Sequence, residues 1–141
     1  MGLILVSAGD DHNQWKDCIL GKKFNTTVKA AKKLVKSGRG YQLDFTHGDT
    51  PQRFLSVADL KNVEARLFNY KGPMKEFIKI KIPILAMFGS NEKFAEHCLG
   101  TMAGKTNSRL FESHIVKGAA HRYCGQESKA ADIISDFVKK L

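Results

Sequence analysis

The clearest pattern in the sequence is a set of short, continuous apolar runs, each of which stops at a turn. The three runs extend from Leu3 to Ser7, from Ile82 to Phe88 and, more weakly, from Leu110 to Val116. A run without polar alternation is typical of a strand that is buried on both faces, as in a parallel sheet covered by helices. Each run is followed by a segment with a helical pattern. The sequence therefore predicts an α/β fold, with a small parallel sheet of about three strands and helices on both faces.

The clearest helical pattern lies at the C-terminal end, from Ser128 to Leu141. Its apolar positions recur at intervals of three and four residues, which places them on one face of a helix. These positions are Ala130, Ile133, Ile134, Phe137, Val138 and Leu141. Lys139 and Lys140 lie in the last turn, where the helix dipole favours cations. This segment is predicted to cover one face of the sheet.

A long segment, residues 12–79, separates the first two strands and exceeds what a single crossover helix needs. Helices are expected near residues 26–36, from Pro51 onward and near residues 74–78. Gly38 suits a left-handed C-cap, and Thr50 suits an N-cap followed by proline. We interpret residues 12–79 as a lid-like helical insert within one domain that spans residues 1–141.

Composition and length fit this interpretation and exclude several classes of protein. Of the 141 residues, 43% are hydrophobic and 26% are charged, as in ordinary globular proteins. No apolar run approaches the roughly 18 residues that cross a bilayer, and no secretory signal is present, so no membrane association is expected. The three cysteines, Cys18, Cys98 and Cys124, are widely separated, which favours reduced thiols and a cytoplasmic location.

The chain carries a net charge of +9, and its densest basic cluster follows helical spacing. Lys29, Lys32, Lys33 and Lys36 lie on one face of the helix expected at residues 26–36. This pattern favours a solvated helix face, and nucleic acid is not the favoured partner. A nucleic-acid or acidic-ligand binder that uses these lysines stays open as an alternative function.

Two stretches resemble the α/β-hydrolase family. Residues 82–92, IPILAMFGSNE, resemble the strand that ends in Gly-x-x-Asp/Glu, where the acid orients the histidine of a catalytic triad. Residues 115–121, IVKGAAH, with the amphipathic helix that follows, resemble the segment that presents that histidine. The resemblance implies that Glu92 and His121 are the acid and the base of a catalytic site. The first strand then resembles the one that follows the nucleophile helix, and the insert falls where the family carries a lid.

The resemblance covers only the C-terminal half of that family. Its nucleophile lies in a Gly-x-Ser-x-Gly turn, which occurs nowhere in these residues. We therefore expect a truncated hydrolase-like protein without autonomous activity, which acts as a dimeric binding or interaction module or has no retained role. The alternative is an esterase-like hydrolase in which Glu92 and His121 use a nucleophile from a partner chain, such as an upstream hydrolase half, or the thiol of Cys124.

The remaining polar candidates favour structural roles. Ser7 and Ser90 lie at strand ends without the glycines of a nucleophile turn, and we expect their hydroxyls to bond nearby backbone. The short clusters of residues 10–12 and of His47 with Asp49 lack the three or four converging ligands of a metal site. No metal and no cofactor are predicted.

The first strand has a further consequence. If the family's neighbouring strand is missing, the strand from Leu3 to Ser7 becomes an apolar edge with unpaired backbone groups. We expect two copies to pair antiparallel through this strand and to form a homodimer with one continuous sheet.

Overall fold

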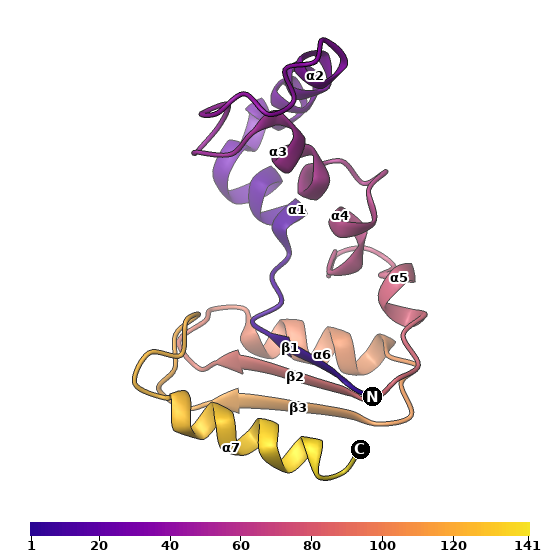
Figure 1. Ribbon diagram of the computed structural model, residues 1–141, viewed down its shortest axis with the longest axis vertical. Coiled ribbons are helices and arrows are strands. Elements are labelled where there is room, and N and C mark those ends of the chain that lie inside the picture. The colour runs from indigo at the N-terminus through magenta and orange to yellow at the C-terminus, as the bar shows by residue number, and fades with distance from the viewer. The chain divides into compact units, whose positions relative to one another are not determined.

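A computed structural model describes residues 1–141 and divides into two compact units (Figure 1). The sheet unit comprises Met1–Gly9 and Phe77–Leu141, and the helical unit comprises Asp10–Glu76. The helical unit covers nearly the same residues as the predicted insert, 12–79. Its role as a lid stays a prediction.

The sheet unit contains three parallel strands in the order β1-β2-β3, which confirms the predicted α/β fold. The strands are β1 (Leu3–Val6), β2 (Ile84–Gly89) and β3 (Phe111–Val116). All six residues of β2 are buried, as its continuous apolar run predicts for a central strand. β2 begins two residues after the run does, because Pro83 has no N–H; its carbonyl oxygen instead accepts a hydrogen bond from the Leu3 N–H at 2.8 Å.

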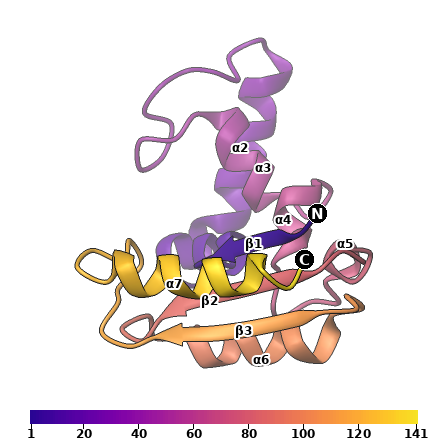
Figure 2. The ribbon, with the colours of Figure 1, turned by 60° about the horizontal axis from the view of Figure 1, so that its bottom comes forward.

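Two helices, α6 (Ala95–Lys105) and α7 (Glu127–Val138), cover opposite faces of the sheet (Figure 2). Leu85 and Met87 point toward α7 and pack in one cluster with Phe137, and all three side chains are fully buried. Ile84 and Phe88 lie on the other face because side chains alternate along a strand. The predicted arrangement of helices on both faces is therefore correct, and α7 follows the apolar stripe of the sequence.

The helical unit contains short helices and no strand of its own. In chain order these are α1 (Asp11–Asn13), a π-helical stretch η1 (Gln14–Leu20), a 3₁₀ turn η2 (Gly21–Lys23), α2 (Phe24–Lys36), α3 (Pro51–Ala58) and α4 (Val63–Leu67), and α5 (Lys75–Ile78) crosses into the sheet unit. Its core is aromatic. Phe54 is fully buried and forms a T-shaped pair with the Trp15 ring, with ring centroids 5.2 Å apart. Phe24 and Phe45 pack around the same ring.

The helix boundaries in this unit follow the local signals in the sequence. Thr50 caps α3: its hydroxyl accepts a hydrogen bond from the Arg53 N–H at 3.2 Å, and Pro51 occupies the first turn. Gly38 follows α2 with a φ of 78°, as expected for a left-handed cap. α2 begins at Phe24, two residues before the expected start.

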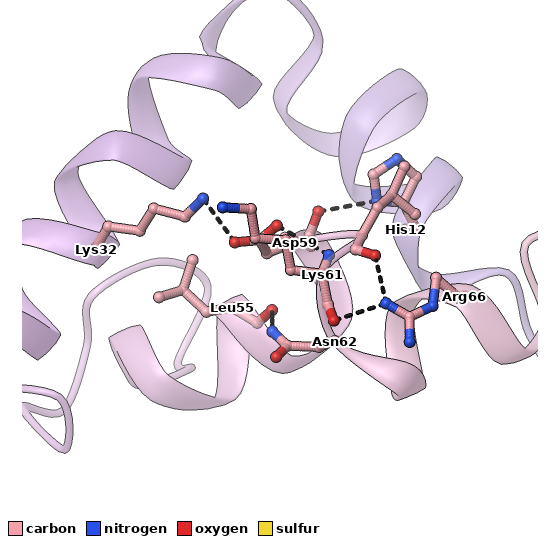
Figure 3. A network of polar contacts seen from close by, with 9 residues as sticks. His12, Lys32, Leu55, Asp59, Lys61, Asn62 and Arg66 are labelled. Atoms are coloured by element: carbon pink, nitrogen blue, oxygen red, sulfur yellow. Dashed lines mark hydrogen bonds and ion pairs between the residues drawn. The ribbon is translucent and has the colours of Figure 1, made fainter.

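The end of α3 and the turn that follows it, residues 59–62, are held by polar contacts from three other helices (Figure 3). Asp59 forms an ion pair with Lys32 of α2, with Nζ and Oδ2 2.6 Å apart. Arg66 of α4 donates to two carbonyl oxygens of the turn, at 2.9 and 2.6 Å. The buried His12 of α1 hydrogen-bonds the last carbonyl oxygen of α3 at 2.9 Å. Three of these bonds satisfy backbone carbonyl oxygens, one at the end of α3 and two in the turn that follows it.

None of the helices combines the length and the apolar character that a membrane-spanning segment requires.

Candidate active site

The candidate site lies where the three strands end. Because the strands are parallel, their carboxyl ends meet at one edge of the sheet, where open parallel sheets place ligands and catalytic groups. Ser7 follows β1, the loop after β2 carries Glu92, and the loop after β3 carries His121. Residues that lie far apart in the sequence therefore meet at this edge.

Backbone contacts join the loops that follow β2 and β3. The Asn91 N–H donates to the Ala119 carbonyl oxygen at 2.9 Å, and the Ser90 N–H donates to that of Val116 at 3.1 Å. The Gly118 N–H donates to the Ser90 hydroxyl at 2.9 Å. These bonds fix the spacing between the segment that carries Glu92 and the segment that carries His121.

Gly89 makes this close approach possible. A Cβ at this position would lie 2.4 Å from the Ala119 carbonyl oxygen and 2.7 Å from its carbonyl carbon. The obstacle is backbone, so a larger residue would separate the two loops. The glycine of the Gly-x-x-Glu sequence is therefore required by packing at the end of β2.

Both carboxylate oxygens of Glu92 form hydrogen bonds, and each has different partners. Oε1 accepts the Ser7 hydroxyl at 2.6 Å and the Gly89 N–H at 2.8 Å. Oε2 lies 3.0 Å from Nδ1 of His121. One oxygen is thus anchored to the sheet, and the other is presented to the imidazole.

The same contacts set the ionisation of Glu92. Burial by itself raises the pKa of this carboxyl, because it disfavours the charged form. Hydrogen bonds from Ser7, Gly89 and His121 outweigh burial and hold the pKa of Glu92 below its usual value. Glu92 is therefore ionised at neutral pH and can only accept hydrogen bonds.

His121 presents its second ring nitrogen to solvent. Its side chain is 71% exposed, whereas that of Glu92 is 17% exposed. Because an ionised carboxylate only accepts, Nδ1 carries the proton of the bond to Glu92. In the neutral ring, Nε2 is then the unprotonated nitrogen, which is the arrangement that a histidine base requires. No hydroxyl or thiol of the sheet unit hydrogen-bonds this nitrogen.

The structure thus brings together the two residues that the sequence singled out, Glu92 and His121. Their catalytic role stays a prediction. Ser7 differs from the expectation for a loop hydroxyl, because its side chain bonds Glu92 rather than nearby backbone. The reason is the parallel pairing of β1 with β2, which places the end of β1 beside the loop that carries Glu92. A serine directly after an apolar run was the only sequence signal for this contact.

Tyr123 was not singled out from the sequence. Its ring is buried in the cluster beneath α7, and its hydroxyl oxygen lies 3.3 Å from Oγ of Ser7. Burial raises the pKa of Tyr123, and the negative charge of Glu92 raises it further, although the bond to Ser7 acts in the opposite direction. The phenol is therefore protonated at neutral pH.

The other candidates lie apart from this arrangement. The Cys124 thiol contacts the Arg122 carbonyl oxygen at 3.9 Å and makes no bond to His121. Asp10 caps α1 through the Asn13 N–H at 3.0 Å, a structural role of the kind that the sequence favours. The structure groups no three histidine, cysteine or acidic side chains as metal ligands.

The basic cluster lies on the exposed side of α2. Lys29, Lys33 and Lys36 are exposed there, and Lys32 is partly neutralised by its ion pair with Asp59. No anion is paired with the first three. This is the solvated face that the sequence favours, and nothing in the structure points to a partner for it.

Comparison with known proteins gives no relative: no family model matches the chain, and searches of curated proteins and of solved structures find no match. The architecture that is shown is a small α/β fold with a three-stranded parallel sheet.

Proposed function

We propose that this chain supplies the acid and the base of a hydrolase-type active site and does not hydrolyse esters by itself. The observation that carries the proposal is the arrangement of Glu92, which is anchored through Oε1 while Oε2 orients His121. A histidine oriented in this way takes a proton from a nucleophile placed at Nε2. The reaction class is acyl transfer from an ester to water.

The order of the elements supports this proposal. The acid follows the middle strand and the histidine follows the outer strand, with an amphipathic helix after it. This order is similar to the C-terminal half of the α/β-hydrolase fold, the family that the motifs resemble. The resemblance thus rests on sequence motifs and on strand order together.

The nucleophile has to come from another polypeptide segment. No Gly-x-Ser-x-Gly sequence occurs in residues 1–141, and no hydroxyl or thiol of the sheet unit is bonded to Nε2 of His121. Ser7 is bonded to the carboxylate instead, and Cys124 contacts a backbone oxygen. Without a nucleophile, a triad loses most of its rate, by several orders of magnitude.

The free edge of β1 offers the place for a partner. β1 pairs only with β2, and the N–H groups of Leu3 and Ser7 are used in that pairing. The N–H groups of Ile4 and Val6 alternate with these and point to the open edge. We propose that two copies of the isolated chain pair antiparallel along this strand. β1 carries no charged side chain that would discourage such pairing.

The first experiment measures hydrolysis of p-nitrophenyl acetate by the isolated chain and by its His121→Ala variant. We expect equal, background rates, because no nucleophile is present at His121. Turnover by the wild-type chain that disappears in His121→Ala would show an autonomous enzyme and contradict the proposal.

A second experiment tests the role of His121 directly. A polypeptide that carries the Gly-x-Ser-x-Gly half of an α/β-hydrolase is co-expressed with this chain and treated with a fluorophosphonate that labels activated serines. The serine of that polypeptide is expected to be labelled in the presence of the wild-type chain. With Glu92→Gln or His121→Ala, the rate of labelling is expected to fall by about 10²-fold or more. Equal labelling with the wild-type chain and both variants would contradict the proposed role of His121 as the base.

The oligomer is tested separately by light scattering after size exclusion. A dimer is expected for the wild-type chain, and Leu5→Lys, which places a charge in the edge strand, is expected to give monomer or precipitate. A wild-type monomer at micromolar concentration would contradict pairing through β1.

A further inference from the structure

We propose that Ser7 and Tyr123 are positioning residues that hold the Glu92 carboxylate in the orientation in which it meets His121. Their catalytic meaning rests on the proposed function, whereas their effect on Glu92 and His121 can be measured without any reaction. Neither residue belongs to the motifs that suggested the site.

The Ser7 side chain is built into the site as a donor. Ser7 is buried, with 6% of its surface exposed, and its hydroxyl lies 2.6 Å from Oε1 of Glu92. A hydroxyl bonded to an ionised carboxylate at this distance makes one of the stronger hydrogen bonds in proteins. The Gly89 N–H is the second donor to the same oxygen, at 2.8 Å. Two donors from two strands thus fix the rotation of the carboxylate.

The proton of each hydroxyl can be assigned from its partners. A serine hydroxyl has one proton, and the carboxylate can only accept, so the Ser7 proton is directed at Glu92. The bond between Ser7 and Tyr123, 3.3 Å long, then takes its proton from the phenol. The result is a chain of donors from Tyr123 to Ser7 to Glu92, in which each bond polarises the next.

The backbone gives independent support. Ser7 has a φ of 49° and Tyr123 a φ of 57°, both in the left-handed region that residues other than glycine rarely adopt. Strained backbone of this kind persists where the surrounding structure requires it, and it gathers at functional sites. Of the five residues other than glycine that have a positive φ, the two in the sheet unit are the two whose hydroxyls meet next to Glu92.

This arrangement assigns Ser7 a role different from that of a nucleophile. Its proton is committed to Glu92, whereas a serine nucleophile gives its proton to the histidine. His121 lies on the other carboxylate oxygen. Ser7 is therefore expected to resist fluorophosphonate labelling in the isolated chain, and labelling at Ser7 that depends on His121 would overturn the assignment.

The main experiment follows the carboxyl carbon of Glu92 by NMR as the pH is varied. Removal of the hydroxyl in Ser7→Ala is expected to raise the pKa of Glu92, and Tyr123→Phe is expected to raise it less. The matched control is Ser108→Ala, which removes a serine at the amino ends of the strands, where the hydroxyl bonds the carbonyl oxygens of Ile82 and Leu110 instead. Equal pKa values in wild type and Ser7→Ala would overturn the proposal, as would an equal rise in Ser108→Ala.

The second readout is the tautomer of His121, observed through its two ring-nitrogen resonances. The wild-type chain is expected to show the proton on Nδ1. Loss of the Ser7 hydroxyl is expected to reduce that population, because the Gly89 N–H is then the only donor left that fixes the rotation of the carboxylate. An unchanged tautomer ratio in Ser7→Ala and Tyr123→Phe would contradict a positioning role.

Ser7→Gly separates the hydroxyl from the strained backbone. Glycine adopts a positive φ without strain, so this variant keeps the fold even if Ser7→Ala does not. It is expected to show the same rise in the pKa of Glu92 as Ser7→Ala. If the pKa of Glu92 in Ser7→Gly equals that of the wild type, Ser7 acts only through its backbone conformation, and the proposal is overturned. Because these readouts need no turnover, they can succeed even if the proposed hydrolase function fails.

Discussion

The sheet unit and the helical unit stabilise their polar groups in different ways. In the sheet unit, residues 7, 92 and 121 come from three strand ends and meet at one carboxylate. In the helical unit, the polar side chains mostly cap helices or bind turns, as at residues 59–62 (Figure 3). The comparison shows why the candidate chemistry lies at the sheet. Parallel strands bring distant loops together, whereas the polar contacts of the helical unit mostly complete its backbone hydrogen bonds.

The largest expected effects come from truncating one core aromatic residue in each unit. Phe137 packs beneath the sheet and Phe54 at the centre of the helical unit, and both are fully buried. Replacing either by alanine is expected to lower the free energy of unfolding by about 3–5 kcal/mol, through lost burial and a residual cavity. Hydrogen exchange then reports which unit loses protection. If either variant exposes both units equally, the two units unfold together and the contrast fails.

A smaller loss is expected from Gly89→Ala, which tests how tightly the two site loops are joined. The new methyl group would meet the Ala119 backbone at 2.4 Å, so we expect a loss of about 1–3 kcal/mol and a weakened contact between Glu92 and His121. Gly100→Ala is the matched control, because nothing lies within 4 Å of the added Cβ in α6. That change is expected to stabilise the helix by about 0.5–1 kcal/mol. Thermal unfolding that ranks the two variants in the other order would contradict the close approach.

In the helical unit, Asp59→Asn is expected to remove about 1 kcal/mol of stability at neutral pH. The hydrogen bond from Lys32 is the main reason that the pKa of Asp59 lies below its usual value, although burial opposes it. A carboxyl with a lowered pKa stabilises the fold above its unfolded-state pKa and loses that contribution as the pH falls through the folded-state pKa. The difference between wild type and variant is therefore expected to shrink below about pH 4. Denaturant titrations at several pH values measure it, and a constant difference would contradict the ion pair.

The smallest expected effects are two acid titrations of opposite sign. The pKa of Glu92 is lowered by its hydrogen bonds against the effect of burial, so acid removes its stabilising contribution. The pKa of Asp11 is raised, because burial outweighs the nearby Arg53. Its contribution is therefore most favourable at low pH and decreases as the pH rises through its folded-state pKa. NMR titration of both carboxyl carbons checks the signs, and shifts in the same direction would remove this difference between the units.

Much of the fold was predictable because it rests on local signals. Continuous apolar runs indicated the three parallel strands, although only the central strand β2 is buried along its whole length, because β1 and β3 lie at the edges of the sheet. The stripe on α7 indicated the face that packs on Leu85 and Met87. Thr50 with Pro51, and Gly38, fixed helix ends through their own backbone preferences. The short helix α4 and the π-helical stretch η1 were not predicted, because five residues carry little periodicity and because η1 departs from the 3.6-residue repeat.

By itself, the sequence determined the α/β fold and singled out Glu92 and His121 as candidates, since the apolar runs and the motif around Glu92 are local patterns along the chain. Only the tertiary structure decided that the Ser7 hydroxyl bonds the Glu92 carboxylate and that the Tyr123 hydroxyl bonds Ser7. Ser7 and Tyr123 are separated by 116 positions, and they meet because β1 and β3, which flank β2, end at the same edge of the parallel sheet. Such a contact depends on strand pairing and on two strained backbone conformations, neither of which leaves a local pattern in the sequence.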